Sequence, residues 1–248
     1  MNFQKLVLLL TLTCLSVSIF ASSFATIKLQ STHNKTHLLQ LYTSEGCSSC
    51  PPADQWLSSQ INNPGLFKDF IPMAFHVDYW DYIGWNDPFA KAAFSERQRL
   101  LKSQNIIKSV YTPGIVYANF EFRQWFKGDR DLSFNFADQS ESADVLTVEI
   151  DGTKLMVDFD SNESNLKVNV AYLKMNQFSH VKSGENHGKQ FTHDFVVAEL
   201  IQFDYKKGKI NDLSFLNETQ NAAISIWITK GNRLENLQAV GGMLSDVF

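Results

Sequence analysis

Two cysteines separated by two residues offer the clearest chemistry in this sequence of 248 residues. Cys47 and Cys50 lie in the stretch LYTSEGCSSCPPAD, where two prolines follow the pair directly. A thiol pair at this spacing serves as a redox couple, as a local disulfide or as part of a metal site. The surrounding residues distinguish these three uses.

A purely structural disulfide would stabilise the fold only slightly at this position. Closing a loop of four residues removes about 2 kcal/mol of unfolded-state entropy, against about 5 kcal/mol for a loop of about 100 residues. A zinc site would be incomplete, because zinc takes four ligands and the sequence has no second cysteine pair. Only His33 and His37 have a spacing typical of metal ligands, and we interpret them as part of a polar N-terminal segment. We therefore predict no metal ligands and no cofactor.

The position of the pair favours redox chemistry. It follows a short apolar strand, predicted over Leu38–Tyr42, and precedes a segment with helical spacing. Such a loop exposes the first sulfur to solvent and to the partial positive charge of a helix N-terminus, and thiol pKa values there fall to roughly 3.5–7. We assign catalytic roles to Cys47, as the attacking thiol, and to Cys50, as the resolving thiol. An inert local disulfide and a copper(I) site remain alternatives, since soft thiolates suit copper(I) better than zinc.

The residues around the pair predict its exposure. Glu45 would raise the thiol pKa of Cys47 if its carboxylate turned inward, but we interpret it as a surface acid. The prolines lack backbone donors, so the regular helix is expected to begin near Cys50 or Pro51. The chain over residues 42–52 is predicted to be a surface loop, with the first sulfur exposed in the turn before the helix.

The elements of the first half alternate between strand and helix. Strands are predicted over Met73–Val77 and Ile115–Ala118, with a partner strand over Phe122–Phe126, and a long helix over Asp87–Ser103. This alternation favours an α/β unit. The long helix is expected to carry an apolar side with Phe89, Ala93 and Leu100.

The second half has a different pattern. Two alternating runs are joined by Asp151 and Gly152, a pair typical of a two-residue type I′ hairpin turn. Further strands are predicted over Leu166–Leu173, within Phe195–Phe203 and over Ala222–Thr229. These patterns indicate a small antiparallel, sandwich-like β domain. The whole chain is therefore expected to be α+β.

The N-terminus has the pattern of a secretory signal peptide. Lys5 precedes an apolar run over Leu6–Phe20, and small residues follow over Ala21–Ala25. The run is shorter than the roughly 20 residues that a bilayer span needs. We predict that residues 1–25, including Cys14, are removed, that no stable membrane insertion remains, and that the protein is periplasmic or secreted.

The remaining chain is long enough for one large domain or two small ones, and we divide it into residues 26–140 and 141–248. The formal net charge of −4 becomes −5 when Lys5 is lost with the signal peptide. This mildly acidic balance gives no reason to expect nucleic acid as a partner. An oxidising compartment favours a disulfide between the two remaining thiols.

Four motifs in order resemble a known family. LYTSEGCSSCPPAD, FHVDYWDYIGWNDPFA, YTPGIVYAN and SGENHGKQFTHDFVV, spread from about Leu38 to Ala198, are similar to secreted bacterial proteins of the family catalogued as domain of unknown function 1223. The order of strand, C-x-x-C, helix, strand, helix and a later YTPG before a strand is similar to the thioredoxin superfamily. The resemblance implies a thioredoxin-like fold for the first domain and thiol chemistry, with no known substrate.

The resemblance also implies a second set of site residues. Thr112 and Pro113 occupy the place of the cis-proline loop, which in that superfamily lies against the cysteine pair and offers backbone groups to a peptide. We therefore expect a cis bond and a substrate-binding role. Thioredoxin has Gly-Pro between its cysteines, whereas this chain has Ser48 and Ser49. That difference leaves the direction of electron flow open.

Two further motifs have a structural and a functional interpretation. The aromatic segment VDYWDYIGWND either packs on its own side chains or lines the active site. The segment from SGENHG to THD is interpreted as a loop fixed by hydrogen bonds from Glu185, Asn186 and His193, with a ligand or metal site there as the alternative.

These observations predict an exported thioredoxin-like protein that exchanges disulfides with protein or small-molecule thiols and disulfides. A copper(I)-binding carrier that uses both thiolates is one alternative. A non-catalytic interaction module whose disulfide only shapes a loop is the other.

Overall fold

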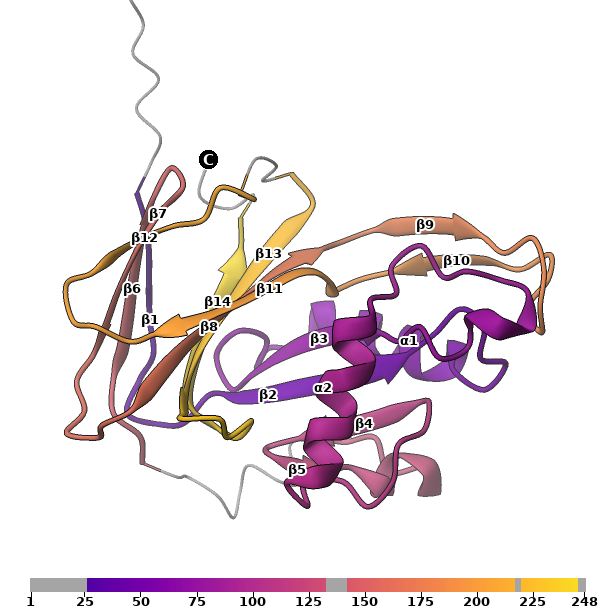
Figure 1. Cartoon of the computed structure of the whole chain (residues 1–248), viewed down its shortest axis with the longest axis horizontal. Coiled ribbons are helices and arrows are strands. Elements are labelled where there is room, and N and C mark those ends of the chain that lie inside the picture. The colour runs from indigo at the N-terminus through magenta and orange to yellow at the C-terminus, as the bar shows by residue number, and fades with distance from the viewer. Residues whose placement is uncertain (1–25, 133–141, 217–219, 245–248) are drawn as a thin grey trace, which may run out of the picture.

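The computed structural model describes residues 26–132, 142–216 and 220–244 (Figure 1). Over these residues the fold is α+β, built mostly of strands with two α-helices. The predicted signal peptide, residues 1–25, lies outside them. Across the described ranges, no helix is both long and apolar enough to cross a membrane.

An eight-stranded sheet forms the centre of the molecule, in the order β14-β13-β8-β11-β3-β2-β4-β5. The strands are β2 (His37–Thr43), β3 (Phe70–His76), β4 (Gly114–Tyr117), β5 (Phe120–Glu121), β8 (Leu166–Lys174), β11 (Val196–Asp204), β13 (Ala222–Lys230) and β14 (Asn236–Met243). β2 and β3 are parallel and buried along their whole length, as expected of strands covered on both faces. β11 joins β3 where Val196 lies opposite Ala74.

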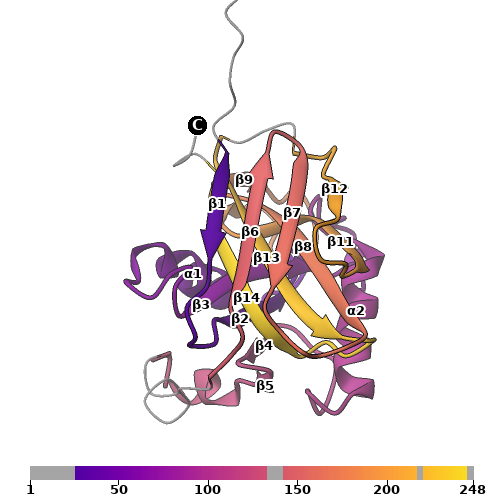
Figure 2. The same ribbon diagram turned by 90° about the vertical axis from the view of Figure 1, so that its left-hand side faces the viewer.

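A second, four-stranded sheet has the order β1-β6-β7-β12. Its strands are β1 (Ile27–Gln30), β6 (Leu146–Asp151), β7 (Lys154–Phe159) and β12 (Ile210–Asp212). Figure 2 shows these strands side by side in front of β13 and β14. The buried residues of β6 and β7 alternate along each strand and pack against apolar residues of β8 and β13. The predicted β6–β7 hairpin is confirmed, with Gly152 and Thr153 as its two loop residues.

Each of the two sheets contains strands from both halves of the chain. β8, β11, β13 and β14 come from the second half, yet they continue the sheet that contains β2 and β3. β1 comes from the first half, yet it pairs with β6. The division at residue 140 stays a prediction, and the eight-stranded sheet runs across it.

The first helix, α1 (Pro51–Ser59), begins where the sequence predicted. Cys50 is its N-cap and Pro51 its first residue, a position at which the missing proline N–H costs nothing. The helix buries Ala53, Trp56 and Leu57, and continues into the 3-10 helix η1 (Gln60–Asn62). The cysteines therefore lie between the end of β2 and the start of α1.

The second helix, α2 (Ala92–Ser103), begins five residues later than predicted. The carboxylate of Asp87 accepts the backbone N–H of Phe89 and of Glu45, which holds residues 87–91 in a turn ahead of the helix. The predicted apolar side was also wrong, since Phe94 and Leu101 are buried while Leu100 is exposed.

The predicted strand over Phe122–Phe126 is wrong. The hairpin after β4 turns at Ala118 and Asn119, both with positive φ, so pairing with β4 ends at Glu121. The 3-10 helix η3 (Arg123–Lys127) follows. The ring centroids of Trp125 and Trp56 are 6.1 Å apart, so η3 packs against α1.

A separate hairpin connects the second half of the chain to the cysteine region. β9 (Gln177–His180) and β10 (Gln190–His193) form a two-stranded antiparallel sheet. In Figure 1 this hairpin extends away from β8 and β11 over the part of the molecule that contains α1. The 3-10 helix η2 (Asp81–Ile83) lies in the aromatic segment on the same side.

Candidate functional site

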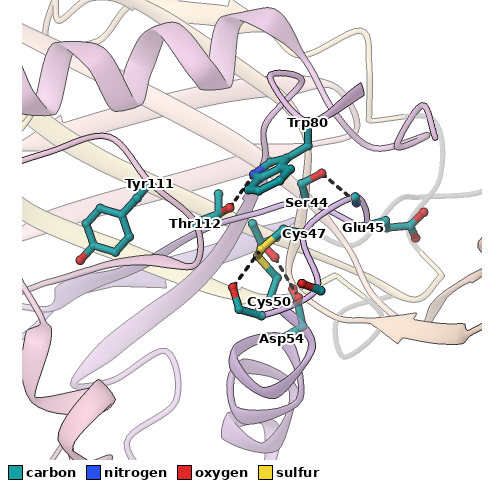
Figure 3. Close-up of a disulfide and its surroundings, with 12 residues drawn as sticks. Ser44, Glu45, Cys47, Cys50, Asp54, Trp80, Tyr111 and Thr112 are labelled. Atoms are coloured by element: carbon teal, nitrogen blue, oxygen red, sulfur yellow. Dashed lines mark hydrogen bonds between the residues drawn. A yellow bond between two sulfur atoms is a disulfide. The ribbon is translucent and has the colours of Figure 1, made fainter. Parts of the chain in front are cut away.

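The sulfurs of Cys47 and Cys50 form a disulfide with a Cα–Cα distance of 5.5 Å, which confirms that the pair is close enough to bridge. The backbone N–H of Cys50 donates to the carbonyl of Cys47, so the four residues form a tight turn. The hydroxyl of Ser49 lies 3.4 Å from the Cys47 sulfur. Figure 3 shows the bridge at the N-terminal end of α1, the helix that carries Asp54.

The predicted surface loop is wrong for most of its length. Cys47 is 1% exposed and Cys50 is 0% exposed, and only Ser48, Ser49 and Pro52 are exposed between residues 42 and 52. The predicted contrast between an exposed first sulfur and a buried second one is therefore absent from the oxidised form. The loop is buried because two other segments cover it.

The first covering segment is the connection between β9 and β10. The side-chain amide of Asn186 donates to the carbonyls of Glu45, at 2.8 Å, and of Cys47, at 3.0 Å. The backbone N–H of Ser48 donates to Glu185 Oε2 at 3.2 Å. The residues predicted to fix their own loop thus bind the cysteine loop, more than 130 positions earlier in the chain.

The second covering segment is the aromatic one. The Trp80 indole N–H donates to the hydroxyl of Thr112 at 2.7 Å, and the Trp85 indole N–H donates to Glu45 Oε2 at 2.8 Å. A Cβ atom added to Gly46 would lie 3.0 Å from Cβ of Trp80, so a larger residue here would have to push the aromatic segment away from the cysteine loop. The segment therefore packs on the cysteine loop and not only on itself.

The bond between Thr112 and Pro113 is cis, as predicted. Figure 3 shows Thr112 and Trp80 in the surroundings of the disulfide, on the side away from α1. The substrate-binding role of this turn stays a prediction.

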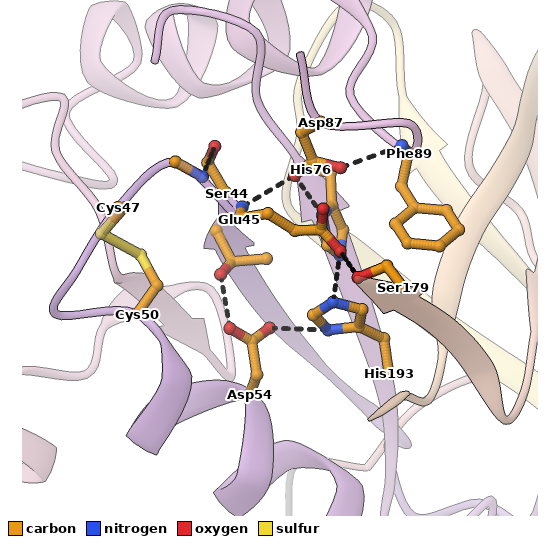
Figure 4. Close-up of polar contacts among 12 residues, drawn as sticks. Ser44, Glu45, Cys47, Cys50, Asp54, His76, Asp87, Phe89, Ser179 and His193 are labelled. Atoms are coloured by element: carbon orange, nitrogen blue, oxygen red, sulfur yellow. Dashed lines mark hydrogen bonds and ion pairs between the residues drawn. A yellow bond between two sulfur atoms is a disulfide. The ribbon is translucent and has the colours of Figure 1, made fainter. Parts of the chain in front are cut away.

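Five ionisable side chains lie beside the disulfide and form what we call the buried polar cluster (Figure 4): Glu45, Asp54, His76, Asp87 and His193. They come from the cysteine loop, α1, β3, the turn before α2 and β10. The side chains of His76, Asp87 and Glu45 are fully buried, that of His193 is 4% exposed and that of Asp54 is 12% exposed. Asp54 is thus the member nearest to solvent.

One half of the cluster is centred on Asp87. His76 Nδ1 lies 2.7 Å from Asp87 Oδ2, which also accepts the backbone N–H of Glu45. Burial alone would raise the pKa of Asp87, but the charge and hydrogen bond of His76 lower it below its usual value. Burial alone would lower the pKa of His76, but the charge and hydrogen bond of Asp87, together with the charges of Asp54 and Glu45, outweigh burial and raise it.

The other half is centred on Glu45. His193 Nε2 lies 3.0 Å from Glu45 Oε1, and the same oxygen accepts the hydroxyl of Ser179. His193 Nδ1 lies 3.8 Å from Asp54 Oδ1, while Thr43 donates to Asp54 Oδ2 at 2.8 Å. Burial raises the pKa of Asp54, although the charges of the nearby histidines oppose this.

Most of this cluster is not recognisable from the sequence. Glu45 is buried and not a surface acid, because Ser179, Trp85 and His193 surround its carboxylate. Asp54 and His76 were assigned no functional role, and Asp87 was predicted only as the start of a helix. One signal was available, since His76 ends an otherwise apolar strand, and a titratable side chain in a buried strand requires a partner.

Two solved structures are similar to this chain. Protein AGR_C_4864 from Agrobacterium tumefaciens, known from an X-ray crystal structure, has a TM-score of 0.64 and 22% identity, covering 86% of this chain and 95% of that one. HBP35 of Porphyromonas gingivalis has a TM-score of 0.54 and 14% identity, covering 88% of this chain and 77% of that one. At these identities the similarity concerns the fold alone. None of the curated proteins matches.

The family comparison covers most of the chain. The model of a family described as protein of unknown function, DUF1223, matches residues 38–230, which span the cysteine loop, the aromatic segment and the β9–β10 hairpin. The resemblance stated from the four motifs is thereby confirmed. The chain belongs to the DUF1223 family.

Proposed function

We propose that this protein is an exported thiol-disulfide oxidoreductase whose couple is Cys47 and Cys50. The observation that carries the proposal is the disulfide itself, which closes only four residues at the start of a helix. Such a short closure contributes little as a structural staple. A reversible couple is the use of this bridge that its position supports best.

The order of elements supports a thioredoxin-like first half. Strand β2, the cysteine turn and α1 lead to the parallel strand β3, then to α2, and then to β4, which lies antiparallel to β2. In this arrangement Thr112 and Pro113 immediately precede β4 on the side of the disulfide (Figure 3). We assign them to docking of an extended substrate segment.

The exchange begins from the reduced pair. The Cys47 thiolate attacks one sulfur of a partner disulfide, forming a mixed disulfide and releasing the other partner sulfur as a thiolate. The Cys50 thiolate then attacks the Cys47 sulfur, restoring the internal bridge and releasing the second partner thiolate. The cysteine pair loses two electrons and the partner disulfide gains them; the reverse sequence oxidises a partner dithiol.

The covering of the loop predicts how partners reach the sulfurs. Both cysteines are buried in the oxidised form, and we expect a small thiol to approach them from the side of the exposed Ser48 and Ser49. A protein partner additionally requires the β9–β10 connection to move, because Asn186 holds the carbonyl of Cys47. We therefore expect faster exchange with small thiols than with large folded proteins.

Trapping of a mixed disulfide tests the proposal. Reduced Cys50→Ser protein, incubated with an oxidised partner such as insulin or with a periplasmic extract, should accumulate a disulfide-linked adduct through Cys47. The Cys47→Ser variant should form none, because the attacking sulfur is missing. The double variant controls for capture by any other group.

Two results would contradict the proposal. Equal alkylation of both thiols together with no adduct would indicate an inert bridge. Tight binding of copper(I) by the reduced protein, lost equally in either single variant, would indicate a carrier that uses the two thiolates as ligands.

A further inference from the structure

The two histidines of the buried polar cluster each have one ring nitrogen without a hydrogen-bond partner. These atoms are Nε2 of His76 and Nδ1 of His193, and both are buried. The two rings lie edge to face with their centroids 4.9 Å apart. A buried polar atom without a partner carries a free-energy cost, so two such atoms in one place require an explanation.

The other nitrogen of each ring is bound to a carboxylate. His76 Nδ1 lies 2.7 Å from Asp87 and His193 Nε2 lies 3.0 Å from Glu45, so a neutral ring carries its proton on that nitrogen. The opposite nitrogen then presents a lone pair. Histidines that bind metal ions are usually oriented in this way, by a carboxylate that accepts the other ring N–H.

A third donor group lies close to the two imidazole rings. One carboxylate oxygen of Asp54 and one nitrogen of each of His76 and His193 all lie within 4.8 Å of one another. The second oxygen of Asp54 accepts the hydroxyl of Thr43, which orients the carboxylate (Figure 4). Two imidazoles and one carboxylate form a donor set that suits divalent transition metals.

The charge of the cluster also favours a cation. The cluster contains three carboxylates, those of Glu45, Asp54 and Asp87. Within the described ranges their ion-pair partners are His76 and His193, and no Lys or Arg side chain compensates their charge. A bound divalent ion would compensate this buried negative charge. The partly exposed Asp54 provides a side from which an ion and a water ligand could enter.

We propose that His76 Nε2, His193 Nδ1 and Asp54 form a binding site for a divalent transition-metal ion of the zinc class, separate from the two cysteines. Asp87 and Glu45 orient the two imidazoles by accepting the N–H of the opposite ring nitrogen. Zinc holds its ligands at about 2.0–2.2 Å, so the three donor atoms must close in around the ion by roughly 1 Å. The site has three protein ligands and leaves a fourth position for water.

The test uses the full-length mature protein with its disulfide intact, so that the thiols cannot serve as ligands. After removal of metals with a chelator, titration with Zn²⁺ followed by calorimetry should show one ion per chain. Nitrogen NMR of the histidine rings in the unmodified protein should show the largest shifts at Nε2 of His76 and Nδ1 of His193. This measurement needs no variant and therefore does not depend on the folding of a core substitution.

Three variants assign the ligands and their supports. Asp54→Asn, which keeps the shape of the side chain, should weaken Zn²⁺ binding by more than about tenfold. Glu45→Gln, which removes the charge behind His193, should weaken binding by about 10–100-fold. His180→Ala, at an exposed position on the same hairpin, is the matched control and should leave affinity unchanged.

Several results would overturn the assignment. These are the absence of Zn²⁺ binding at millimolar concentration, shifts confined to exposed histidines, or equal affinity in Asp54→Asn and the unmodified protein. Binding of Co²⁺ that appears only after reduction, with a thiolate charge-transfer band, would place the metal on the cysteines instead. Because the titration uses the oxidised protein, its outcome is independent of disulfide exchange.

Discussion

The cysteine loop and the buried polar cluster lie side by side and differ in how they are built (Figure 4). The chemistry of the loop comes from two residues three positions apart, joined by a covalent bond. The cluster joins residues as distant as Glu45 and His193, 148 positions apart, through hydrogen bonds and ion pairs. The cysteine pair is visible as a motif in the sequence. The cluster beside it also consists of chemically reactive side chains, but it forms only when the folded chain brings them together.

The two regions also differ in what they contribute to stability. The disulfide closes a short loop and constrains the unfolded chain only slightly. Each carboxylate of the cluster, in contrast, accepts hydrogen bonds or ion pairs from several groups, and its loss leaves these buried groups without a partner. We therefore expect the cluster to stabilise the fold more than the covalent bridge does.

The largest effect is expected at Asp87. Asp87→Ala removes the acceptor of His76 and of the backbone N–H groups of Glu45 and Phe89, so the free energy of unfolding should fall by about 3–5 kcal/mol. Urea denaturation measures this. Asp87→Asn, which keeps an acceptor but removes the charge, should lose less. A loss below about 1 kcal/mol for Asp87→Ala would show that the cluster is not structural.

Reduction of the disulfide should have a smaller effect. Without a covalent link between Cys47 and Cys50, the free energy of unfolding should fall by about 2 kcal/mol, because only a four-residue loop is released. Urea denaturation with and without a reductant measures the difference, and the Cys47→Ala/Cys50→Ala double variant should not respond to the reductant. A decrease above about 4 kcal/mol would identify the bridge as a structural staple.

The next effect concerns access to the bridge. Asn186→Ala removes two hydrogen bonds that hold the β9–β10 connection on the cysteine loop, which should favour opening by about 1–3 kcal/mol. Reduction by glutathione should become about tenfold faster. His187→Ala, at the exposed neighbouring position, should leave the rate unchanged. Equal rates in both variants would mean that this connection does not limit access.

The smallest effect is expected at the aromatic segment. Thr112→Val removes the acceptor of the Trp80 indole N–H and should lower the free energy of unfolding by about 1 kcal/mol, as for a single hydrogen bond. Tryptophan fluorescence during urea denaturation measures it. Thr112→Ser, which retains a hydroxyl, should recover most of the loss. If Thr112→Val is as stable as the unmodified protein, this hydrogen bond contributes no net stability.

Much of the local structure followed from the sequence. Strands β2, β8 and β13, the β6–β7 hairpin and the start of α1 were predicted, because apolar periodicity, Asp-Gly and the two prolines act over a few residues. The bridge between Cys47 and Cys50 was also predicted, from their spacing and the expected oxidising compartment. The start of α2 was missed because the acceptor groups of Asp87 bind Glu45 and His76, which are distant in the chain.

The residue pattern alone was sufficient to locate the cysteine pair, the strand before it and the helix after it. It did not reveal that the loop is buried, that Glu45 faces inward, or that His76 and His193 meet beside Asp54. These features differ in the range of the interactions that produce them. Turn chemistry and helix starts depend on neighbouring residues, whereas burial and ion pairing depend on what the folded chain brings alongside, here a hairpin more than 130 residues away from the loop it covers.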